Sequence, residues 1–171
     1  MIALQDNSPA VVSPGIYPML YAFFDDRGVL RQDPFWRQVD AALGTQAAGV
    51  AILGLGTEVS KLTFDERIEV LEVVAERIEG RKPLLATVYG DTITEQIEFS
   101  KRAIQSGASA LMLQPPSQKM DDAKLVGFFS EIISAVDCPV GIQNAPEFLG
   151  FGLSNQSLIA LANDHENFTI A

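Results

Sequence analysis

The feature that most restricts the fold of this chain is a repeat of apolar, strand-like segments spaced roughly 30 residues apart. Between each pair of segments lies one stretch in which apolar residues recur at the spacing of an amphipathic helix. A strand followed by a helix is the βα unit, and its strict alternation predicts a parallel sheet with helices packed outside it. The first strand is expected from Met19 to Phe24, and the segments begin near Ile16, Gly49, Leu84, Ala108, Val140 and Phe168.

Two α/β architectures contain such repeats, an open doubly wound sheet and a closed (β/α)₈ barrel. A barrel needs eight units and typically ~250 residues. This chain of 171 residues supplies five units and the start of a sixth strand. Length alone therefore favours the open sheet. The helical patterns do not separate the two architectures, so the loops between the elements must decide.

The stretch Gly54-Leu55-Gly56-Thr57-Glu58 joins a buried-strand pattern to a helix. A Ser/Thr-x-x-Glu capping box opens that helix at Thr63 and Glu66, and a second box is expected at Thr92 and Glu95. The order strand, glycine turn, helix presents backbone N–H groups to an anion. The turn matches neither the phosphate-binding loop with its Lys-Ser/Thr nor GxGxxG. A plain βα turn without a ligand is the alternative interpretation.

Composition excludes several classes of function. A net charge of −10 and a sequence pI of about 4.4 argue against a surface for nucleic acid or anionic membranes. One cysteine, Cys138, and one histidine, His165, give poor support to a zinc site or a Ser-His triad, so we predict no metal. No apolar run reaches membrane-spanning length, and no signal peptide is recognisable. We therefore predict a soluble, cytoplasmic protein without membrane partners, in which residues 1–14 form a flexible arm.

At its loops the chain resembles the dihydrodipicolinate synthase / N-acetylneuraminate lyase family. The stretch from Ile52 to Glu58, with Leu62-Thr63 and Glu66-Arg67 behind it, is similar to the family's strand-two signature. That signature is Leu-Gly-[Ser/Thr]-Thr-Gly-Glu, followed by Leu-[Ser/Thr] and Glu-Arg. The similarity covers about residues 15–171 in order and spacing. The other matching motifs are Phe24-Asp25-x-x-Gly28, Gly107-Ala108, Pro115-Pro116, Pro139-Val140 and Asn144-x-Pro146.

The resemblance implies a (β/α)₈ TIM barrel, of which residues 15–171 supply the first five βα units and the sixth strand. Members of this family are class I, Schiff-base lyases that act on pyruvate and other 2-keto acids. The resemblance thus implies a small-molecule 2-keto acid as partner, a homotetramer and no cofactor. The Schiff-base lysine ends the family's sixth strand, and in this register it would follow Ala171. We also expect residues 1–171 not to be a self-sufficient folded unit, because an open barrel leaves two strand edges unpaired.

Several positions depart from the pattern of the family's synthases. The two tyrosines and the threonine that those enzymes use as a hydroxyl relay are replaced by Gln143, by Ser117, and by Leu55 or Gly56. The arginine that binds the carboxylate of aspartate semialdehyde aligns with Phe148. Dihydrodipicolinate synthesis is therefore not expected. Glutamine at the tyrosine position resembles the branch that dehydrates 2-keto-3-deoxy sugar acids.

This interpretation assigns catalytic roles to Gln143 and Thr57. The backbone N–H groups of residues 55–57 and the Thr57 hydroxyl would hold the substrate carboxylate. Gln143 would hydrogen-bond a substrate hydroxyl or a catalytic water, in a reaction that dehydrates or cleaves the sugar acid. Two alternatives stay open, a non-catalytic or truncated 2-keto-acid binder and, less favoured, an authentic dihydrodipicolinate synthase. The candidate substrate-binding residues are Gly54, Leu55, Gly56, Thr57, Ser117 and Asn144.

Overall fold

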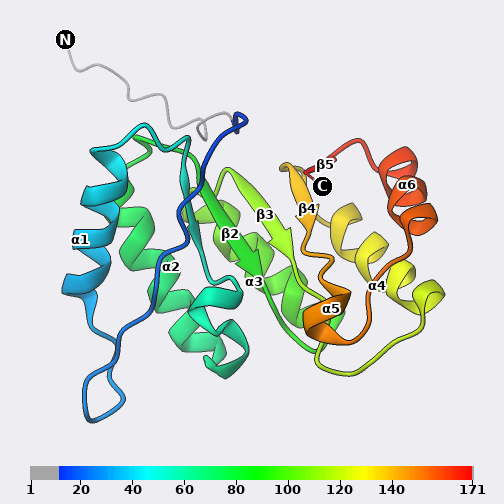
Figure 1. The fold of residues 1–171 in the computed structure, drawn as a ribbon, viewed down its shortest axis with the longest axis horizontal. Helices are drawn as coiled ribbons and strands as arrows, with labels where there is room; N and C mark the ends of the chain where they lie inside the picture. The colour runs from blue at the N-terminus through cyan, green and yellow to red at the C-terminus, as the bar shows by residue number, and fades with distance from the viewer. Residues whose placement is uncertain (1–11, 171) are drawn as a thin grey trace.

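The computed structural model describes residues 12–170, which form a five-stranded parallel sheet and its helices (Figure 1). The strands follow one another in chain order across the sheet. Residues 1–11 of the predicted arm lie outside the described range. The strands are β1 (Val50–Ile52), β2 (Leu84–Val88), β3 (Ala110–Leu113), β4 (Val140–Ile142) and β5 (Phe168–Ile170). The helices are α1 (Gln32–Leu43), α2 (Phe64–Ile78), α3 (Ile93–Gln105), α4 (Asp122–Ser134), α5 (Pro146–Leu149) and α6 (Asn155–Asp164), with short 3₁₀ turns η1 (Leu55–Thr57) and η2 (Val59–Lys61).

A further segment pairs with β1 at the edge of the sheet. Met19 lies opposite Ala51 in a parallel bridge, and the Leu20 N–H donates to the Ala51 carbonyl at 2.8 Å. The pairing ends there, so the strand expected from Met19 to Phe24 is shorter in the structure. The reason is that the Gln38 side chain of α1 binds both the N–H and the carbonyl of Tyr21, at 2.8 and 3.0 Å. Those backbone groups are therefore not available to a ladder.

The helices cover one face of the sheet. In β2, Ala86 and Val88 point toward the helices and are fully buried, whereas Leu85 on the other face is only half-buried. Met112 in β3 is half-buried in the same way between two buried neighbours. The helices pack in chain order, α1 on α2, α2 on α3, α3 on α4 and α4 on α6. A doubly wound sheet carries helices on both faces, so this one-sided arrangement corresponds to the wall of a barrel.

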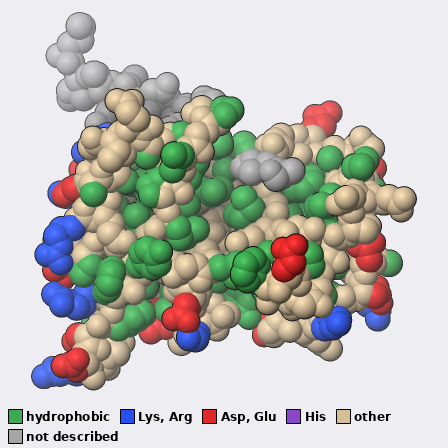
Figure 2. All heavy atoms as spheres, viewed as in Figure 1, with side chains coloured by type: hydrophobic (Ala, Val, Ile, Leu, Met, Phe, Trp, Pro, Cys, Tyr) green, Lys and Arg blue, Asp and Glu red, His purple; other side chains and the backbone are tan. Residues whose placement is uncertain are grey.

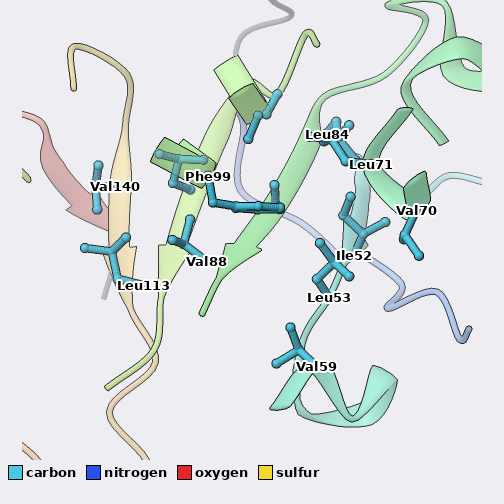
Figure 3. Close-up of a cluster of buried hydrophobic side chains, with 14 of the residues drawn as sticks. Ile52, Leu53, Val59, Val70, Leu71, Leu84, Val88, Phe99, Leu113 and Val140 are labelled. Carbon is cyan, nitrogen blue, oxygen red and sulfur yellow. The ribbon is translucent and has the colours of Figure 1, made fainter. Parts of the chain in front are cut away.

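The core lies between the sheet and its helices (Figure 3). Ile52 of β1 and Val88 of β2 contribute to it with Leu71 of α2 and Phe99 of α3, all fully buried. The rings of Phe99 and Phe64 meet edge to face, with centroids 6.1 Å apart. Each such side chain contributes about 1.5–3 kcal/mol by leaving water. This packing holds the start of each helix against the end of the strand before it.

The two predicted capping boxes have different outcomes. At α2 the box is complete, because the Thr63 N–H donates to the Glu66 carboxylate at 2.7 Å and the Glu66 N–H donates to the Thr63 hydroxyl at 3.2 Å. At α3 only half of it forms. The Thr92 hydroxyl accepts the Glu95 N–H at 3.1 Å, but the Glu95 carboxylate turns to Arg67 instead. Glu95 is thereby recruited to a network at the end of the sheet.

Among residues 12–170 there is no helix whose length and apolarity would let it cross a membrane.

Candidate active site

The residues that follow the parallel strands meet at the carboxyl edge of the sheet. The register sets Val88, Leu113 and Ile142 side by side in one row. The next residue of each strand lies one step further, so Tyr89, Gln114 and Gln143 form the following row. These three residues are the first after β2, β3 and β4, so they lie at the carboxyl edge of the sheet. We call Tyr89, Gln114 and Gln143 the rim row.

A hydrogen bond joins two members of the rim row. The Gln114 Nε2 donates to the Gln143 Oε1 at 2.7 Å, and Gln114 is almost fully buried while Gln143 is half-buried. The Gln143 N–H also donates to the Leu113 carbonyl at 2.8 Å, which continues the ladder to the rim. The oxygen of the Gln143 amide is thus bound, and its Nε2 donates to no group of the described residues. Gln143 therefore presents an oriented donor at the position predicted for it.

The turn after β1 begins with backbone strain. Leu53 is fully buried and has a left-handed φ of +62°, a conformation that costs a non-glycine residue of order 1–3 kcal/mol. It turns the chain into the 3₁₀ turn η1, where the Thr57 N–H donates to the Gly54 carbonyl at 3.0 Å. The N–H groups of Leu55 and Gly56 donate to no other group within residues 12–170. Two unpaired backbone donors at one turn can receive an anion.

Thr57 anchors this turn to the sheet edge. Its hydroxyl donates to the Leu20 carbonyl at 2.8 Å, and the residue is 6% exposed. The hydroxyl and the N–H of Thr57 are both engaged within the fold. Of the carboxylate clamp predicted over residues 55–57, the structure therefore leaves the N–H groups of Leu55 and Gly56 available. The catalytic role assigned to Thr57 stays a prediction.

Gly54 contributes through its missing side chain. A Cβ at this position would come within 2.3 Å of the Met19 Cε and 3.7 Å of the Thr87 Oγ1. The Gly54 N–H points to the Met19 sulfur at 3.2 Å. Glycine therefore allows the turn after β1 to lie directly against the neighbouring segments.

Ser117 and Asn144 lie in the loops that follow β3 and β4. The Ser117 N–H donates to the Asp91 Oδ1 at 2.8 Å, which joins the loops after β2 and β3. The Asn144 side chain holds the backbone of Leu153, with both of its hydrogen bonds at 2.9 Å. Asn144 thus closes its own loop, whereas Ser117 is exposed at the rim. Substrate contacts by either residue remain predictions.

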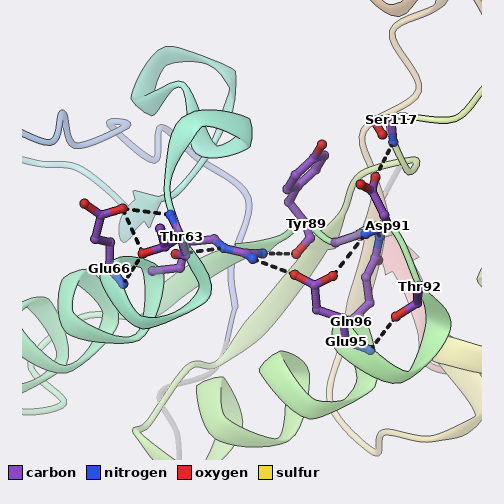
Figure 4. Close-up of polar contacts among 10 residues, drawn as sticks. Thr63, Glu66, Tyr89, Asp91, Thr92, Glu95, Gln96 and Ser117 are labelled. Carbon is purple, nitrogen blue, oxygen red and sulfur yellow. Dashed lines mark hydrogen bonds and ion pairs between the residues drawn. The ribbon is translucent and has the colours of Figure 1, made fainter.

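A buried arginine, Arg67, binds groups in the loops that follow the strands (Figure 4). Arg67 is 4% exposed, and its guanidinium binds the Glu95 carboxylate at 2.6 Å, the Tyr89 carbonyl and the Thr63 carbonyl. It also lies 5.8 Å from the centre of the Tyr89 ring. Gln96 adds a second tie, because its Nε2 donates at 2.9 Å to the carbonyls of both Gly90 and Gln114. The loops after β2 and β3 are therefore held in a fixed relation.

Two titratable groups at the rim have shifted pKa values. Hydrogen bonds from the Ser117 hydroxyl and N–H hold the pKa of Asp91 below its usual value, so Asp91 is a carboxylate at neutral pH. Desolvation raises the pKa of Tyr89, the negative charge of Asp91 raises it further, and the Ser117 hydroxyl partly opposes them. Tyr89 is consequently a neutral phenol at neutral pH.

The described part of the chain offers neither a lysine in the rim row nor a metal site. Lys61 pairs with Glu58 in the turn after β1. Lys82 binds the carbonyls of Ala42, Thr45 and Ala47 at the end of α1. No group of three or more His, Cys, Asp or Glu side chains in residues 12–170 is arranged to hold a metal ion.

The surface has a second hollow away from the rim row. A groove of about 530 Å³ with a largely apolar lining runs between the first segment, at Ile16 to Tyr21, and the α1 residues Gln38 to Ala42. Figure 2 shows hydrophobic side chains gathered over the middle of the face without helices, with most charged side chains toward its periphery. The groove follows the unpaired edge beside β1, whereas the candidate site lies at the carboxyl ends of the strands.

Sequence reasoning missed Tyr89 and Gln114. Each is the first residue after a buried strand, as Gln143 is, and this position was the signal that could have identified them. The loop motifs directed attention to Ser117 and to the turn after β1, because those stretches carry the family pattern. Register is a property of neighbouring strands, so the rim row becomes visible only when the pairing is known.

Comparison with known proteins identifies relatives of this chain. The sequence pattern of the Dihydrodipicolinate synthetase family matches residues 13–169. The 4-hydroxy-tetrahydrodipicolinate synthase of Pelobacter propionicus is 30% identical over 141 residues, which are 82% of this chain and 48% of the relative. YagE of Escherichia coli K12, provisionally named a 2-dehydro-3-deoxy-D-gluconate aldolase, is 28% identical over 154 residues, which are 90% of this chain and 51% of the relative.

Solved structures show the same fold. The crystal structure of YagE in complex with pyruvate has a TM-score of 0.86 at 28% identity, over 91% of this chain and 53% of that one. The dihydrodipicolinate synthase of Aquifex aeolicus has a TM-score of 0.85 at 23% identity, over 91% of this chain and 53% of that one. The chain spans about half the length of these relatives.

These relatives decide between the two architectures left open by the repeat. The parallel sheet is the N-terminal part of a (β/α)₈ barrel, as the loop motifs predicted, and the open doubly wound sheet favoured by length alone is wrong. The family pattern covers nearly all of the described residues, and the chain therefore belongs to the dihydrodipicolinate synthetase family.

Proposed function

We propose that this chain forms the N-terminal part of the active site of a Schiff-base lyase that acts on a 2-keto-3-deoxy sugar acid. The observation that carries the proposal is the rim itself. It combines an oriented amide donor at Gln143 with two unpaired N–H groups at Leu55 and Gly56, at the carboxyl edge where barrel enzymes place their chemistry. These groups suit a substrate with a carboxylate at one end and hydroxyls along its chain.

The proposed reaction begins with a lysine that would follow Ala171 and condense with the C2 ketone. The iminium withdraws electrons from C3, a base removes the C3 proton, and an enamine forms. The enamine then expels the C4 hydroxyl in a dehydration, or the C3–C4 bond breaks in an aldol cleavage. Gln143 would donate to a substrate hydroxyl, and the turn after β1 would bind the carboxylate.

Two observations favour a sugar acid, whose far end carries hydroxyls, over aspartate semialdehyde with its additional carboxylate. Phe148 in α5 is 82% exposed at the position where the synthases carry an arginine, so it offers no charge to a second carboxylate. Gln143 and Ser117 likewise take the places of the two tyrosines. The name of YagE, a 2-dehydro-3-deoxy-D-gluconate aldolase, points to the same class of substrate.

A non-catalytic 2-keto-acid binder is the alternative function. None of the lysines in the described residues belongs to the rim row, and Lys82 is fully engaged elsewhere. The coding sequence after Ala171 separates the two functions, since an in-frame lysine at the next position supports the lyase. A homotetramer in the cytoplasm is proposed from family membership.

Borohydride trapping tests the proposal in the complete polypeptide. Incubation with pyruvate or 2-keto-3-deoxy acids and borohydride should add one reduced substrate per chain by mass spectrometry. The variant Gln143→Leu should keep the adduct and lose turnover by about 10²-fold, the usual effect of removing one oriented donor. Gln156→Leu, in an exposed position of α6, is the matched control and should retain full activity. Absence of an adduct with every keto acid would overturn the lyase assignment.

A further inference from the structure

Gln114 is the most deeply buried member of the rim row, and its backbone is fixed at two points. The residue is 3% exposed. Its N–H donates to the Val88 carbonyl at 2.9 Å, and its carbonyl accepts from the Gln96 Nε2 at 2.9 Å. Gln96 is itself fully buried, and its Nε2 also donates to the Gly90 carbonyl. Both β2 and α3 therefore hold Gln114 in place, and the proposed function gives its side chain no role.

The side chain of Gln114 determines which end of the Gln143 amide is free. A side-chain amide has one acceptor oxygen and one donor nitrogen, so two amides that bind each other must pair nitrogen with oxygen. Gln114 uses its Nε2, which donates to the Gln143 Oε1 at 2.7 Å. The Gln143 Nε2 is thereby left for a substrate. If Gln114 offered an acceptor instead, the Gln143 amide would turn over and present its oxygen.

The two reactions open to a 2-keto-3-deoxy acid need opposite partners at the C4 oxygen. In a dehydration the C4–O bond breaks and the oxygen leaves with the electron pair, so a hydrogen-bond donor stabilises the negative charge that develops there. In an aldol cleavage the C4 hydroxyl loses its proton while the C3–C4 bond breaks and a C4=O bond forms, so this hydroxyl needs an acceptor. One amide in one orientation serves only one of the two reactions.

We propose that Gln114 is the positioning residue that fixes the Gln143 amide with its Nε2 outward and thereby directs the lyase toward dehydration. The inference rests on the proposed function and decides between its two outcomes. The lone pair of the enamine nitrogen restores the C2=N iminium, the C2=C3 pair forms the C3=C4 bond, and the C4–O bond breaks. The Gln143 N–H binds the departing oxygen and keeps its own proton. The proton that the base took from C3 and the hydroxide that leaves C4 together make the one water released.

The first test removes the donor of Gln114. Gln114→Met in the complete polypeptide should lower kcat for dehydration of 2-keto-3-deoxypentonates and 2-keto-3-deoxyhexonates by about 10-fold. This is less than the about 10²–10³-fold effect of deleting a donor, because the Gln143 Nε2 remains but is no longer oriented. KM and borohydride trapping of pyruvate should stay nearly unchanged, and the share of pyruvate among the products should rise. Leu111→Met, at a buried position of β3, controls for packing and should keep the wild-type product ratio.

The second test makes the donor depend on pH within one protein. In Gln114→Glu the protonated carboxyl group donates to the Gln143 Oε1, as the amide does. The carboxylate that forms at higher pH accepts from the Gln143 Nε2 instead and turns this amide over. Burial raises the pKa of a carboxyl group, which brings the change toward neutral pH. The ratio of dehydration product to pyruvate, relative to wild type at each pH, should therefore fall as the pH rises. A residue that only supported the fold would not cause this dependence.

The outcomes separate the inference from the proposed function. A product ratio equal to that of wild type in Gln114→Met, and in Gln114→Glu at every pH, would overturn the inference. If Gln114→Met does not fold, the titration of Gln114→Glu alone decides. A wild-type polypeptide that traps pyruvate with borohydride but only cleaves its sugar acids would refute the role of Gln114 while the lyase stands. Failure of the wild-type polypeptide to trap any keto acid would overturn both.

Discussion

Replacing Arg67 by methionine should destabilise the protein more than any exposed ion-pair substitution. Methionine keeps the aliphatic stem among Phe64, Tyr89 and Phe99 but removes every donor that binds Glu95 and the two carbonyls. Breaking a buried ion pair by removing one partner costs about 3–5 kcal/mol. Glu95 is 32% exposed and can partly recover hydration, so we expect the lower end, about 3 kcal/mol, which is roughly a 10²-fold change in the unfolding equilibrium.

Equilibrium urea unfolding of the complete polypeptide measures this loss. A double-mutant cycle with Glu95→Gln isolates the pair, and we expect a coupling energy of about 1–2 kcal/mol because the second substitution removes the stranded charge. Arg102→Met is the matched control. Arg102 binds Glu72 at 2.9 Å with both side chains about half exposed, and such pairs contribute about 0–1 kcal/mol. A loss at Arg67 no larger than the loss at Arg102 would refute the argument from burial.

Three further expectations follow from single contacts. Lys82→Met should cost about 2 kcal/mol in the same urea assay, because it removes a cation bound to three carbonyls at the end of α1; an unchanged midpoint would contradict this. Gly54→Ala should cost about 1–3 kcal/mol through its contact with Met19, and Met19→Ala in the same chain should relieve part of the loss; equal losses in both proteins would count against the contact. Burial raises the pKa of Cys138 to about 11, so its thiol should react with iodoacetamide about 10²-fold more slowly at pH 8 than an unhindered thiol of pKa ≈ 8.5; a rate equal to that of the free thiol would exclude this.

Much of the fold followed from patterns that depend on neighbours in sequence. Alternation of apolar segments and helical patterns predicted the βα units, and the complete capping box at Thr63 is a local motif that needs no tertiary partner. The half-formed box at Thr92 shows the limit. The Glu95 carboxylate of this box binds Arg67, a residue 28 positions earlier. Local helix propensity does not include an ion pair between residues so far apart in the sequence.

The candidate site was predictable only where it is carried by motifs. The turn after β1 and Gln143 were named from the loops, and the structure places both at the carboxyl edge of the sheet. In the structure the Thr57 hydroxyl donates to the Leu20 carbonyl, and the Asn144 amide donates to the Leu153 carbonyl. A linear sequence pattern does not encode these contacts between segments. Gln114 was overlooked for the same reason, because its importance depends on the strands beside it.

The chain order of the strands has a consequence for how the protein is made. Each strand after β1 pairs with the strand that precedes it in sequence, α2, α3 and α4 each pack on the helix before them, and α6 packs on α4. A chain emerging from the ribosome therefore always finds the docking surface for its newest unit already synthesised, and every loop that closes is short. Folding can advance from the N-terminus one βα unit at a time, in step with translation. The slowest closure would be left for the last strand, which must find the edge beside Met19.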